Sequence, residues 1–380
     1  MLSEFVFLIG SGLSCAAGLP SVDKLTDEIF DMENVFKHSD NHFYKNKSKP
    51  SIDHFPEYYE YNEVIEKILK ITSCEIEKYY GNNYKANYEE IYYLVKQIED
   101  KFEYDNPAML AFIEKVNVEI KSLLKGYVNF NESIRNSVKY IEDTIWHILA
   151  QKFENSIVLN FILEKISEVN FVIFSLNYDY LIEQILQEYK IEFINGFKTL
   201  NERIKIWDDN LFDQKSRIKL YKLHGSVSWV RYIIDNFKGY FYADIGLNDI
   251  YLLKDNKGDY LRPPAEGPRF LIGSVNKILE YSRELFSELF YRFHCVLKNT
   301  NLLIVIGYGF KDKGINSKII EYMYYNFNNK IIIVDKKEKE ELLKDARFAI
   351  QNNIPKWENE KRLRFICKDI KDFSLDEIKD

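Results

Sequence analysis

The sequence of 380 residues predicts an α/β fold in which a parallel β-sheet is interrupted by a large helical insertion. Short apolar runs that end in glycine or polar residues indicate buried strands, at 5–9, 171–174, 218–223 and 302–306. Between the first two runs, residues 61–165 show a helical period of apolar side chains. A strand–helix–strand pattern over 302–334 indicates parallel strands joined by a helix.

The stretch after the first apolar run, GSGLSCAAGLP at residues 10–20, is the most informative part of the chain. Glycines at the end of a buried strand let backbone N–H groups approach a diphosphate, and the helix that follows directs its positive end at the same charge. The usual dinucleotide fingerprint, Gly-x-Gly-x-x-Gly, fails because Cys15 occupies the third glycine position. The stretch therefore indicates a nucleotide-binding loop of another pattern, and the alternative is a tight turn between strand and helix.

Three further strand ends carry glycine or polar residues. They have the sequences SLNYD at 175–179, LHGS at 223–226 and GYGFKD at 307–312. In open parallel sheets the ligand crevice lies beyond the carboxyl ends of the strands. The four segments are therefore expected to share one pocket.

Taken in order, the four segments resemble the sirtuin set: a glycine-rich loop, an Asn-x-Asp turn, a His-Gly pair and a late glycine loop. The variants GSGLS, NYD, LHGS and GYGF are more similar to the sirtuin-like NADases of bacterial antiphage defence than to the histone-deacetylating branch. The resemblance covers the start and roughly the second half of the chain. It implies a Rossmann-like parallel sheet and NAD as a substrate.

The chain also departs from the deacylating sirtuins, which carry a zinc module with two Cys-x-x-Cys pairs. The only cysteines here are Cys15, Cys74, Cys295 and Cys367, and no Cys-x-x-Cys occurs, so no zinc ribbon is expected. Residues 21–23 are Ser-Val-Asp where the family expects Asp-Phe-Arg, and Leu176 replaces the glutamine that usually precedes the catalytic asparagine. The resemblance thus implies the NAD-binding shell without the equipment for a peptide substrate.

These observations divide the chain into three parts. A discontinuous sirtuin-like catalytic domain is expected at 1–36 and 168–380, with the helical insertion at 37–167. Short alternating segments at 227–272 predict a small metal-free subdomain within the catalytic domain. Single helices are expected at 22–36 and at 278–297.

Three residues are the candidate catalytic groups. By resemblance, Asn177 positions a water near the anomeric carbon of NAD, and Asp179 engages the nicotinamide carboxamide. His224 follows a strand and precedes a glycine, and a histidine titrates near neutral pH, so it can accept a proton from a hydroxyl or a water. The alternatives are a helix cap for Asn177, a carboxylate in the first turn of a helix for Asp179, and a core histidine for His224.

The remaining candidates bind the nucleotide. Ser11, Gly12 and Ser14 are expected to contact the diphosphate, and Gly307 and Gly309 to let the second loop approach the adenosine half. An acidic residue at a strand end commonly binds a ribose hydroxyl, which makes Asp335 the ribose candidate. The resemblance adds four further positions to this shell, namely Gly10, Pro20, Ser175 and Gly225.

Composition limits the classes of partner. The net charge of −7 and a pI of about 5.6 offer no overall attraction to nucleic acid, so no direct binding to it is expected. No apolar stretch has the length of a membrane span, and the start of the chain lacks the features of a secretory signal, so a cytoplasmic location is expected. Aromatic residues make up 16% of the chain and include a run of tyrosines at 79–93, which favours an assembly interface or packing within the insertion.

The sequence-based expectation is an NAD hydrolase that releases nicotinamide and ADP-ribose, with an NAD-dependent protein deacylase and a non-catalytic sensor of NAD or an ADP-ribose derivative as alternatives. An unrestrained NAD hydrolase would poison its own cell, so its activity is expected to be gated. We expect a homo-oligomer. By resemblance, the companion protein is an ATPase of the HerA class or a short Argonaute.

Overall fold

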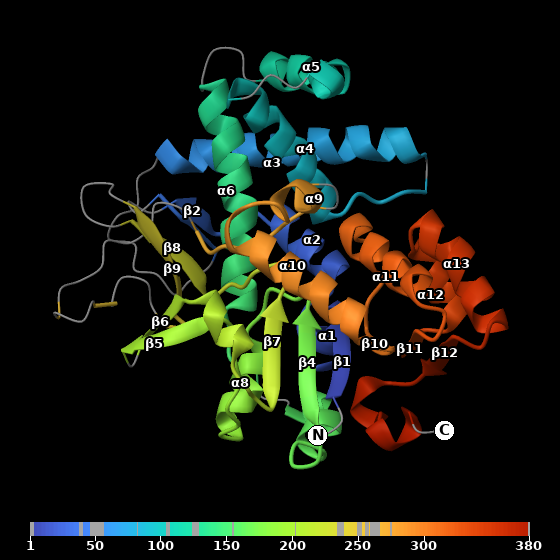
Figure 1. Ribbon diagram of the computed structural model, residues 1–380. Helices are drawn as coiled ribbons and strands as arrows, with labels where there is room; N and C mark the ends of the chain where they lie inside the picture. Colours follow the sequence, from blue (N-terminus) through green and yellow to red (C-terminus); the bar gives the residue numbers. More distant parts are fainter. Residues whose placement is uncertain are drawn as a thin grey trace. The chain divides into compact units, whose positions relative to one another are not determined.

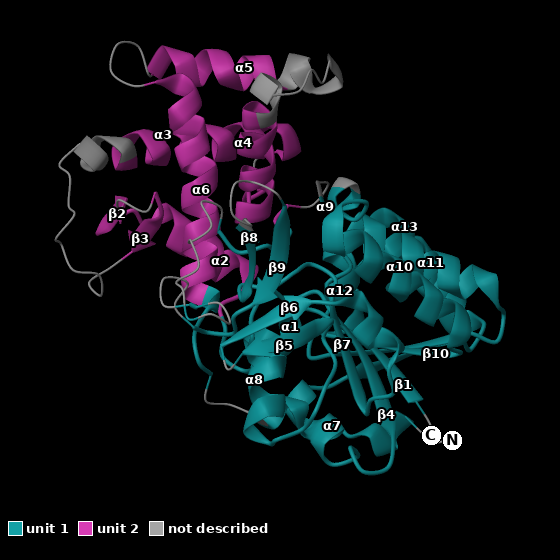
Figure 2. Cartoon of the chain, turned by 60° about the vertical axis from the view of Figure 1, so that its left-hand side comes forward, with its two compact units in different colours: residues 1–19, 149–271, 277–380 teal, residues 20–148, 272–276 magenta. Residues whose placement is uncertain are grey.

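The computed structural model describes residues 4–37, 41–45, 57–81, 83–103, 107–123, 129–153, 156–201, 203–233, 239–248, 253–254, 258, 267–273 and 276–378. The chain forms two compact units (Figure 2). Unit 1 comprises residues 1–19, 149–271 and 277–380, and unit 2 comprises residues 20–148 and 272–276.

Unit 1 is built on a six-stranded sheet of parallel strands, which confirms the predicted fold class (Figure 1). The order across the sheet is β12-β11-β10-β1-β4-β7, so the chain progresses outward from β1 in one direction and then returns to its other side. That reversal makes the gap between β1 and β10 the topological switch point, where open α/β sheets bind ligands. The strands span Glu4–Ile9 (β1), Asn170–Ser175 (β4), Ile218–Lys222 (β7), Leu302–Ile306 (β10), Lys330–Asp335 (β11) and Leu363–Cys367 (β12).

The strand register brings the predicted loops to one edge of this sheet. Ile9 at the end of β1 lies opposite both Ser175 of β4 and Ile306 of β10. Ser175 in turn lies opposite Lys222 of β7, and Ile306 lies opposite Val334 of β11. Because these neighbouring strands end within one residue of each other, the segments that follow them emerge side by side.

Helices cover the sheet through apolar faces at helical spacing. In α10, Leu285, Leu289, Phe293 and Leu297 are all buried, and the ring of Phe293 lies 4.7 Å from that of Phe174 in β4. Figure 1 shows α10 crossing in front of β4 and β7. The helices of unit 1 span Ser11–Ala16 (α1), Asn160–Leu163 (α7), Leu181–Glu188 (α8), Glu284–Asn299 (α10), Lys313–Tyr325 (α11), Lys339–Asp345 (α12) and Phe348–Asn359 (α13), with α9 at Asn276–Glu280 crossing the unit boundary.

A four-stranded antiparallel sheet forms the small subdomain of unit 1, in the order β5-β6-β9-β8. Its strands are Phe197–Asn201 (β5), Ile204–Trp207 (β6), Trp229–Ile233 (β8) and Tyr240–Asp244 (β9), so two of them precede the predicted range of 227–272. Aromatic packing joins the earlier and later strands, since Trp229 lies within 6.2 Å of both Phe197 and Trp207, ring centre to ring centre. Residues 249–252, part of a predicted segment here, lie outside the described residues.

Unit 2 contains the predicted helical insertion, together with a short hairpin. The predicted helix at 22–36 stops at Phe30, because Asp31 leaves the helical conformation (φ −80°, ψ 93°), and Asn34, at φ +57°, lies in the turn that leads into β2. The helices span Val22–Phe30 (α2), Glu57–Tyr80 (α3), Tyr88–Glu103 (α4), Pro107–Leu123 (α5) and Phe130–Leu149 (α6), and the hairpin strands span Val35–Lys37 (β2) and Phe43–Lys45 (β3).

The unit boundaries differ from the sequence-based division at residues 36 and 167. Helix α2 groups with unit 2 because its backbone and side chains bond there: Tyr140 Oη donates to Ile29 O at 2.9 Å, and Tyr88 N donates to Thr26 Oγ1 at 3.0 Å. Residues 149–167 group with unit 1, where Phe161 of α7 packs 5.4 Å from Phe7 of β1.

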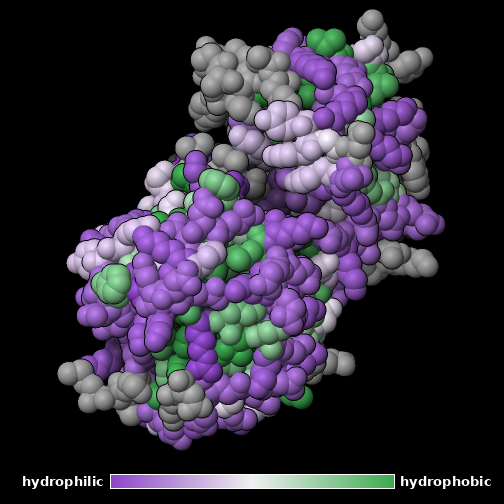
Figure 3. Space-filling model, turned by 90° about the vertical axis from the view of Figure 1, so that its right-hand side faces the viewer, coloured by the Kyte–Doolittle hydropathy of each residue, from purple (hydrophilic) through white to green (hydrophobic). Residues whose placement is uncertain are grey.

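The surface carries isolated apolar areas within a largely hydrophilic face (Figure 3). Across the described residues, no helix is both long and apolar enough to cross a bilayer. Over the same residues, no cluster of three or more His, Cys, Asp or Glu side chains has the geometry to hold a metal ion.

Candidate active site

The two glycine loops meet at the switch point of the sheet. Gly10 N donates to Ile306 O at 2.9 Å, and Gly12 N donates to Gly307 O at 2.8 Å. A Cβ on Gly10 would lie 2.6 Å from Gly307 O, and one on Gly12 would lie 2.6 Å from Gly307 Cα. Gly307 itself has φ +57°. Glycine is required at all three positions because the two backbones touch. The N–H of Gly12 already donates a hydrogen bond to the second loop.

Asn177 lies two residues beyond the end of β4 and is bonded directly to the first loop. Its Nδ2 donates to Gly10 O at 3.0 Å and to Ser14 Oγ at 2.8 Å, and Ser14 Oγ donates to Asp179 Oδ2 at 2.7 Å. The carbonyl of Gly10 can only accept, which fixes the amide with its nitrogen toward the loop. Asn177, Ser14 and Asp179 are all buried, so we call these three residues the Asn177 cluster.

The amide oxygen of Asn177 is the part of the cluster that can meet a ligand. Among the described residues, Oδ1 of Asn177 accepts no hydrogen bond, so it remains available to orient a water or a sugar hydroxyl. The helix-cap alternative for Asn177 is wrong, because α8 begins at Leu181 with Tyr180 as its N-cap. Asp179 does bond to that helix, since its Oδ1 accepts from Leu181 N at 3.1 Å while Oδ2 faces Ser14. Ser175 Oγ accepts from Asn177 N at 3.2 Å and so supports the turn.

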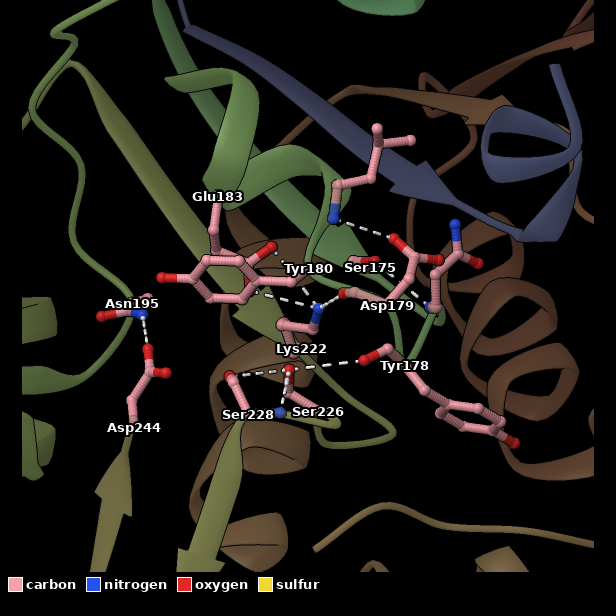
Figure 4. A network of polar contacts seen from close by, with 12 residues as sticks. Ser175, Tyr178, Asp179, Tyr180, Glu183, Asn195, Lys222, Ser226, Ser228 and Asp244 are labelled. Carbon is pink, nitrogen blue, oxygen red and sulfur yellow. Dashed lines mark hydrogen bonds and ion pairs between the residues drawn. The ribbon is translucent and has the colours of Figure 1, made fainter. Parts of the chain in front are cut away.

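A buried ion pair supports the backbone of this turn (Figure 4). Lys222, the last residue of β7, donates from Nζ to the carbonyl oxygen of Asp179 and lies 3.1 Å from Glu183 Oε1. Burial raises the pKa of Glu183 to about 7, and the charge of Lys222 opposes that rise. Neither residue was predicted from the sequence. Their signal was a charge at the end of a buried strand and another within an apolar helix.

His224 lies in a second buried group, which is linked to the turn of Asn177 through the carbonyl of Leu176. Its Nδ1 donates to Leu176 O at 3.0 Å, and its Nε2 lies 2.6 Å from Tyr281 Oη and 3.2 Å from Asp312 Oδ2. Tyr281 Oη donates to the same Asp312 oxygen at 2.8 Å. Burial would raise the pKa of Asp312, yet the hydrogen bond and charge of His224, with the charge of Lys277, hold it below its ordinary range.

Tyr281 and Asp312 were also missed from the sequence. Asp312 closes the GYGFKD segment and caps α11, where its Oδ1 accepts from Ile315 N at 3.0 Å. Tyr281 lies between α9 and α10, where the sequence predicted one continuous helix at 278–297. That prediction is wrong at 281–283, where the helix is interrupted. Tyr281 lies at this interruption, and its side chain is buried and bonded to Asp312.

Gly225 fixes the backbone beside His224. It has φ +77°, and a Cβ there would lie 2.2 Å from Arg269 O. The segment that crowds it is hydrogen-bonded on either side, since Ser226 N donates to Arg269 O at 3.1 Å and Leu271 N donates to His224 O at 2.8 Å. Only glycine fits this conformation and this approach.

In the part of the chain that the structure describes, the other predicted binding residues make no hydrogen bond to the side chains of the Asn177 cluster. Asp335 ends β11, and its Oδ1 accepts from Lys337 N at 2.8 Å while burial raises its pKa. It neighbours the second glycine loop, because Gly307 N donates to Val334 O at 3.0 Å. Gly309 has open space where a Cβ would stand, Ser11 is exposed at the start of α1, and Pro20 belongs to unit 2.

Several solved sirtuin structures are similar to the chain at low identity. Sir2Tm bound to a propionylated peptide is 13% identical with a TM-score of 0.36, covering 99% of this chain and 92% of that chain. Sir2 bound to an acetylated peptide is 12% identical with a TM-score of 0.37 and the same coverage. A mutant Sir2 homologue in complex with ADP-ribose is 13% identical with a TM-score of 0.35, covering 91% of this chain and 85% of that chain.

A comparison with family models gives a direct assignment. No curated protein matches the chain. Residues 172–366, just over half of the chain, match the model of the SIR2-like domain, a description that indicates NAD-related activity. The matched range contains the turn of Asn177, the His-Gly pair and the second glycine loop. The chain therefore belongs to the SIR2-like domain family.

Proposed function

We propose that this protein is an NAD hydrolase that cleaves the bond between nicotinamide and ribose and releases nicotinamide and ADP-ribose. The observation that carries the proposal is the Asn177 cluster, a buried amide fixed by two hydrogen bonds at the switch point of the sheet. Family membership supports NAD as the substrate class.

The cluster has the chemistry that this cleavage needs. Glycosidic cleavage proceeds through a transition state with positive charge on the sugar, so the enzyme must stabilise that charge and place a water near the anomeric carbon. The Oδ1 atom of Asn177 can accept a hydrogen bond from such a water. Asp179 places a carboxylate in the same cluster, and His224, bonded through Nδ1 to Leu176 O next to Asn177, is the candidate base once its Nε2 is deprotonated.

The test is an assay of products together with a matched pair of variants. Purified protein is incubated with NAD, with and without an acetylated peptide, and nicotinamide, ADP-ribose and O-acetyl-ADP-ribose are separated by chromatography. We expect ADP-ribose in both reactions and a loss of about 100-fold or more in turnover for Asn177→Ala. Asn329→Ala is the control, because Asn329 is also a buried amide of unit 1 and bonds to Tyr322 O at 2.7 Å, outside the site.

Three outcomes would contradict the proposal. O-acetyl-ADP-ribose formed in step with NAD loss would show a deacylase. Binding of NAD without any product would show a sensor. Normal turnover in Asn177→Ala, or an equal loss in Asn329→Ala, would remove the cluster from the reaction.

We further propose that assembly controls the NAD hydrolase and that its role is antiphage defence, a role that rests on the sequence resemblance. Within unit 2, Tyr79, Tyr80 and Tyr84 are 74%, 59% and 37% exposed, and their rings contact one another at 5.1 and 4.4 Å. Tyr88 and Tyr92 are instead buried in the unit. Exposed, mutually packed tyrosines are typical of protein interfaces.

Light scattering over a concentration series tests this control. We expect an oligomer, and we expect Tyr79→Ser/Tyr80→Ser to weaken it and to change the rate of NAD loss. A wild-type monomer at all concentrations, with full activity and no response to a companion ATPase or Argonaute, would contradict the proposal.

A further inference from the structure

Three polar atoms from separate segments meet at one point, and one of them is Nε2 of His224. Nε2 of His224 lies 2.6 Å from Tyr281 Oη and 3.2 Å from Asp312 Oδ2, and the two oxygen atoms lie 2.8 Å apart. All three side chains are buried. The three atoms therefore share a small number of protons out of reach of bulk water.

The protons can be counted from the donors and acceptors. Leu176 O can only accept, so Nδ1 of His224 carries a proton. The single proton of the Tyr281 hydroxyl is donated to Asp312. The proton between Nε2 and Tyr281 Oη must then come from Nε2, which leaves both ring nitrogens protonated.

We propose that Tyr281 and Asp312 are positioning residues that hold His224 as an imidazolium cation in the ligand-free protein. The protein would thus rest with its candidate base already protonated. The consequence for catalysis rests on the proposed function: His224 can act as a base only after Nε2 has lost this proton, so the rate should rise with pH along the titration of His224 itself.

The surrounding charges are consistent with this state. The pKa of Asp312 is below its ordinary range in spite of burial because of the hydrogen bond and charge of His224, so the carboxylate and the imidazolium stabilise each other. Burial together with Asp312 raises the pKa of Tyr281 well above its ordinary range. Lys277 carries a positive charge, which opposes a second positive charge on His224. It is buried 5.6 Å from the ring of Tyr178, which is itself 6.2 Å from the His224 ring, and it acts on Asp312 as well.

Among the described residues, Tyr308 also faces the triad of His224, Tyr281 and Asp312. The hydroxyl of Tyr308 accepts from Asp312 N at 3.2 Å and donates to Asn316 Oδ1 at 2.9 Å, so it bonds to the backbone of Asp312 and to α11. Of the charged groups named, the Asp312 carboxylate at 3.2 Å has a direct contact with Nε2 and so dominates its charge state.

The experiment is an NMR titration of the ligand-free full chain with isotope-labelled histidine. The chain has six histidines, and His224→Gln identifies the signal of His224. We expect His224 to stay protonated above the usual histidine midpoint of about 6.5. In Asp312→Asn, which keeps a side chain able to cap α11, the midpoint should fall by about one pH unit or more. Tyr281→Phe should lower it less, because Asp312 remains near Nε2.

A buried tyrosine elsewhere supplies the control. Tyr322 donates to Lys330 O at 3.0 Å, and Tyr322→Phe should leave the midpoint of His224 unchanged. A wild-type midpoint at or below about 6.5 overturns the inference, and so does a midpoint that Asp312→Asn and Tyr281→Phe both leave unchanged. If one variant does not fold, the wild-type midpoint and the other variant still decide.

The titration separates this inference from the proposed function, because it needs neither NAD nor turnover. A protein with a raised His224 midpoint and no NAD cleavage would refute the hydrolase and leave the triad standing. If the hydrolase is confirmed, the acidic limb of kcat/KM against pH should move with the NMR midpoint in the variants, which a purely structural role would not produce.

Discussion

Replacing Glu183 by glutamine tests which force governs the buried carboxyl beneath the Asn177 turn. Burial disfavours its charge, whereas Lys222 at 3.1 Å favours it. Lys222 also donates to the Asp179 carbonyl, so its ammonium group is shared between that carbonyl and the Glu183 carboxyl. Burial is the larger effect, and it raises the pKa of Glu183 from 4.5 to about 7 in the folded protein.

The size and sign of the effect follow from proton linkage. Below about pH 4.5 the carboxyl is neutral in both the folded and the unfolded chain and contributes nothing to pH dependence. As the pH rises toward 7, the unfolded chain loses the proton and the folded chain keeps it, so stability falls. At about 1.4 kcal/mol per pH unit, the rise of the pKa from 4.5 to about 7 corresponds to roughly 3 kcal/mol above pH 7.

The assay is urea denaturation near pH 5 and near pH 8, followed by tryptophan fluorescence. Three of the four tryptophans, Trp207, Trp229 and Trp357, lie in unit 1 and report on its unfolding. Glu183→Gln cannot titrate, so relative to wild type it should gain up to about 3 kcal/mol between the two pH values. Glu188→Gln, an exposed change on the same helix, should differ from wild type by less than about 0.5 kcal/mol at both.

A pH-independent difference between wild type and Glu183→Gln would refute this reasoning. It would mean that Lys222 fully offsets the burial of the carboxyl. A gain in the opposite direction, with the variant losing stability as the pH rises, would mean that the ion pair outweighs burial.

Three further predictions concern the site. Gly12→Ala should destabilise the protein by about 1–3 kcal/mol in thermal unfolding and abolish NAD binding, because the added methyl meets the Gly307 backbone, whereas Gly309→Ala has open space and should cost less than about 1 kcal/mol. Ser14→Ala should cost about 1–3 kcal/mol and lower turnover, because it leaves Asp179 Oδ2 without its donor; unchanged kinetics would contradict the cluster. Elemental analysis of the isolated protein should find far less than one zinc per chain, and stoichiometric zinc would contradict the expectation drawn from the cysteine pattern.

Much of the fold could be predicted because its signals are local. Consecutive apolar residues such as those of β1 and β10 mark strands buried on both faces, and the helical period of residues 61–165 marks the insertion. The glycine and polar segments after the strands could be assigned to one edge of the sheet, because parallel strands all end on the same side. Asn177 and Ser14 could be named as candidates on that ground together with the resemblance to sirtuins.

The side-chain partnerships were beyond the sequence. Ser14 and Asp179 are 165 positions apart, and nothing local to either residue indicates their hydrogen bond. The apolar period of 278–297 continues through Tyr281, so only a tertiary partner, Asp312, shows that the helix is interrupted there.

The sequence by itself determined the main buried strands of the parallel sheet, the helical character of the insertion and the polar and glycine segments that follow those strands, because those properties depend on residues a few positions apart. The tertiary structure alone decided which atoms of those loops meet, how deeply Glu183 and His224 are buried and which charges face them. Burial and Coulomb interactions depend on separation in space rather than along the chain, and those two quantities set the protonation of the site.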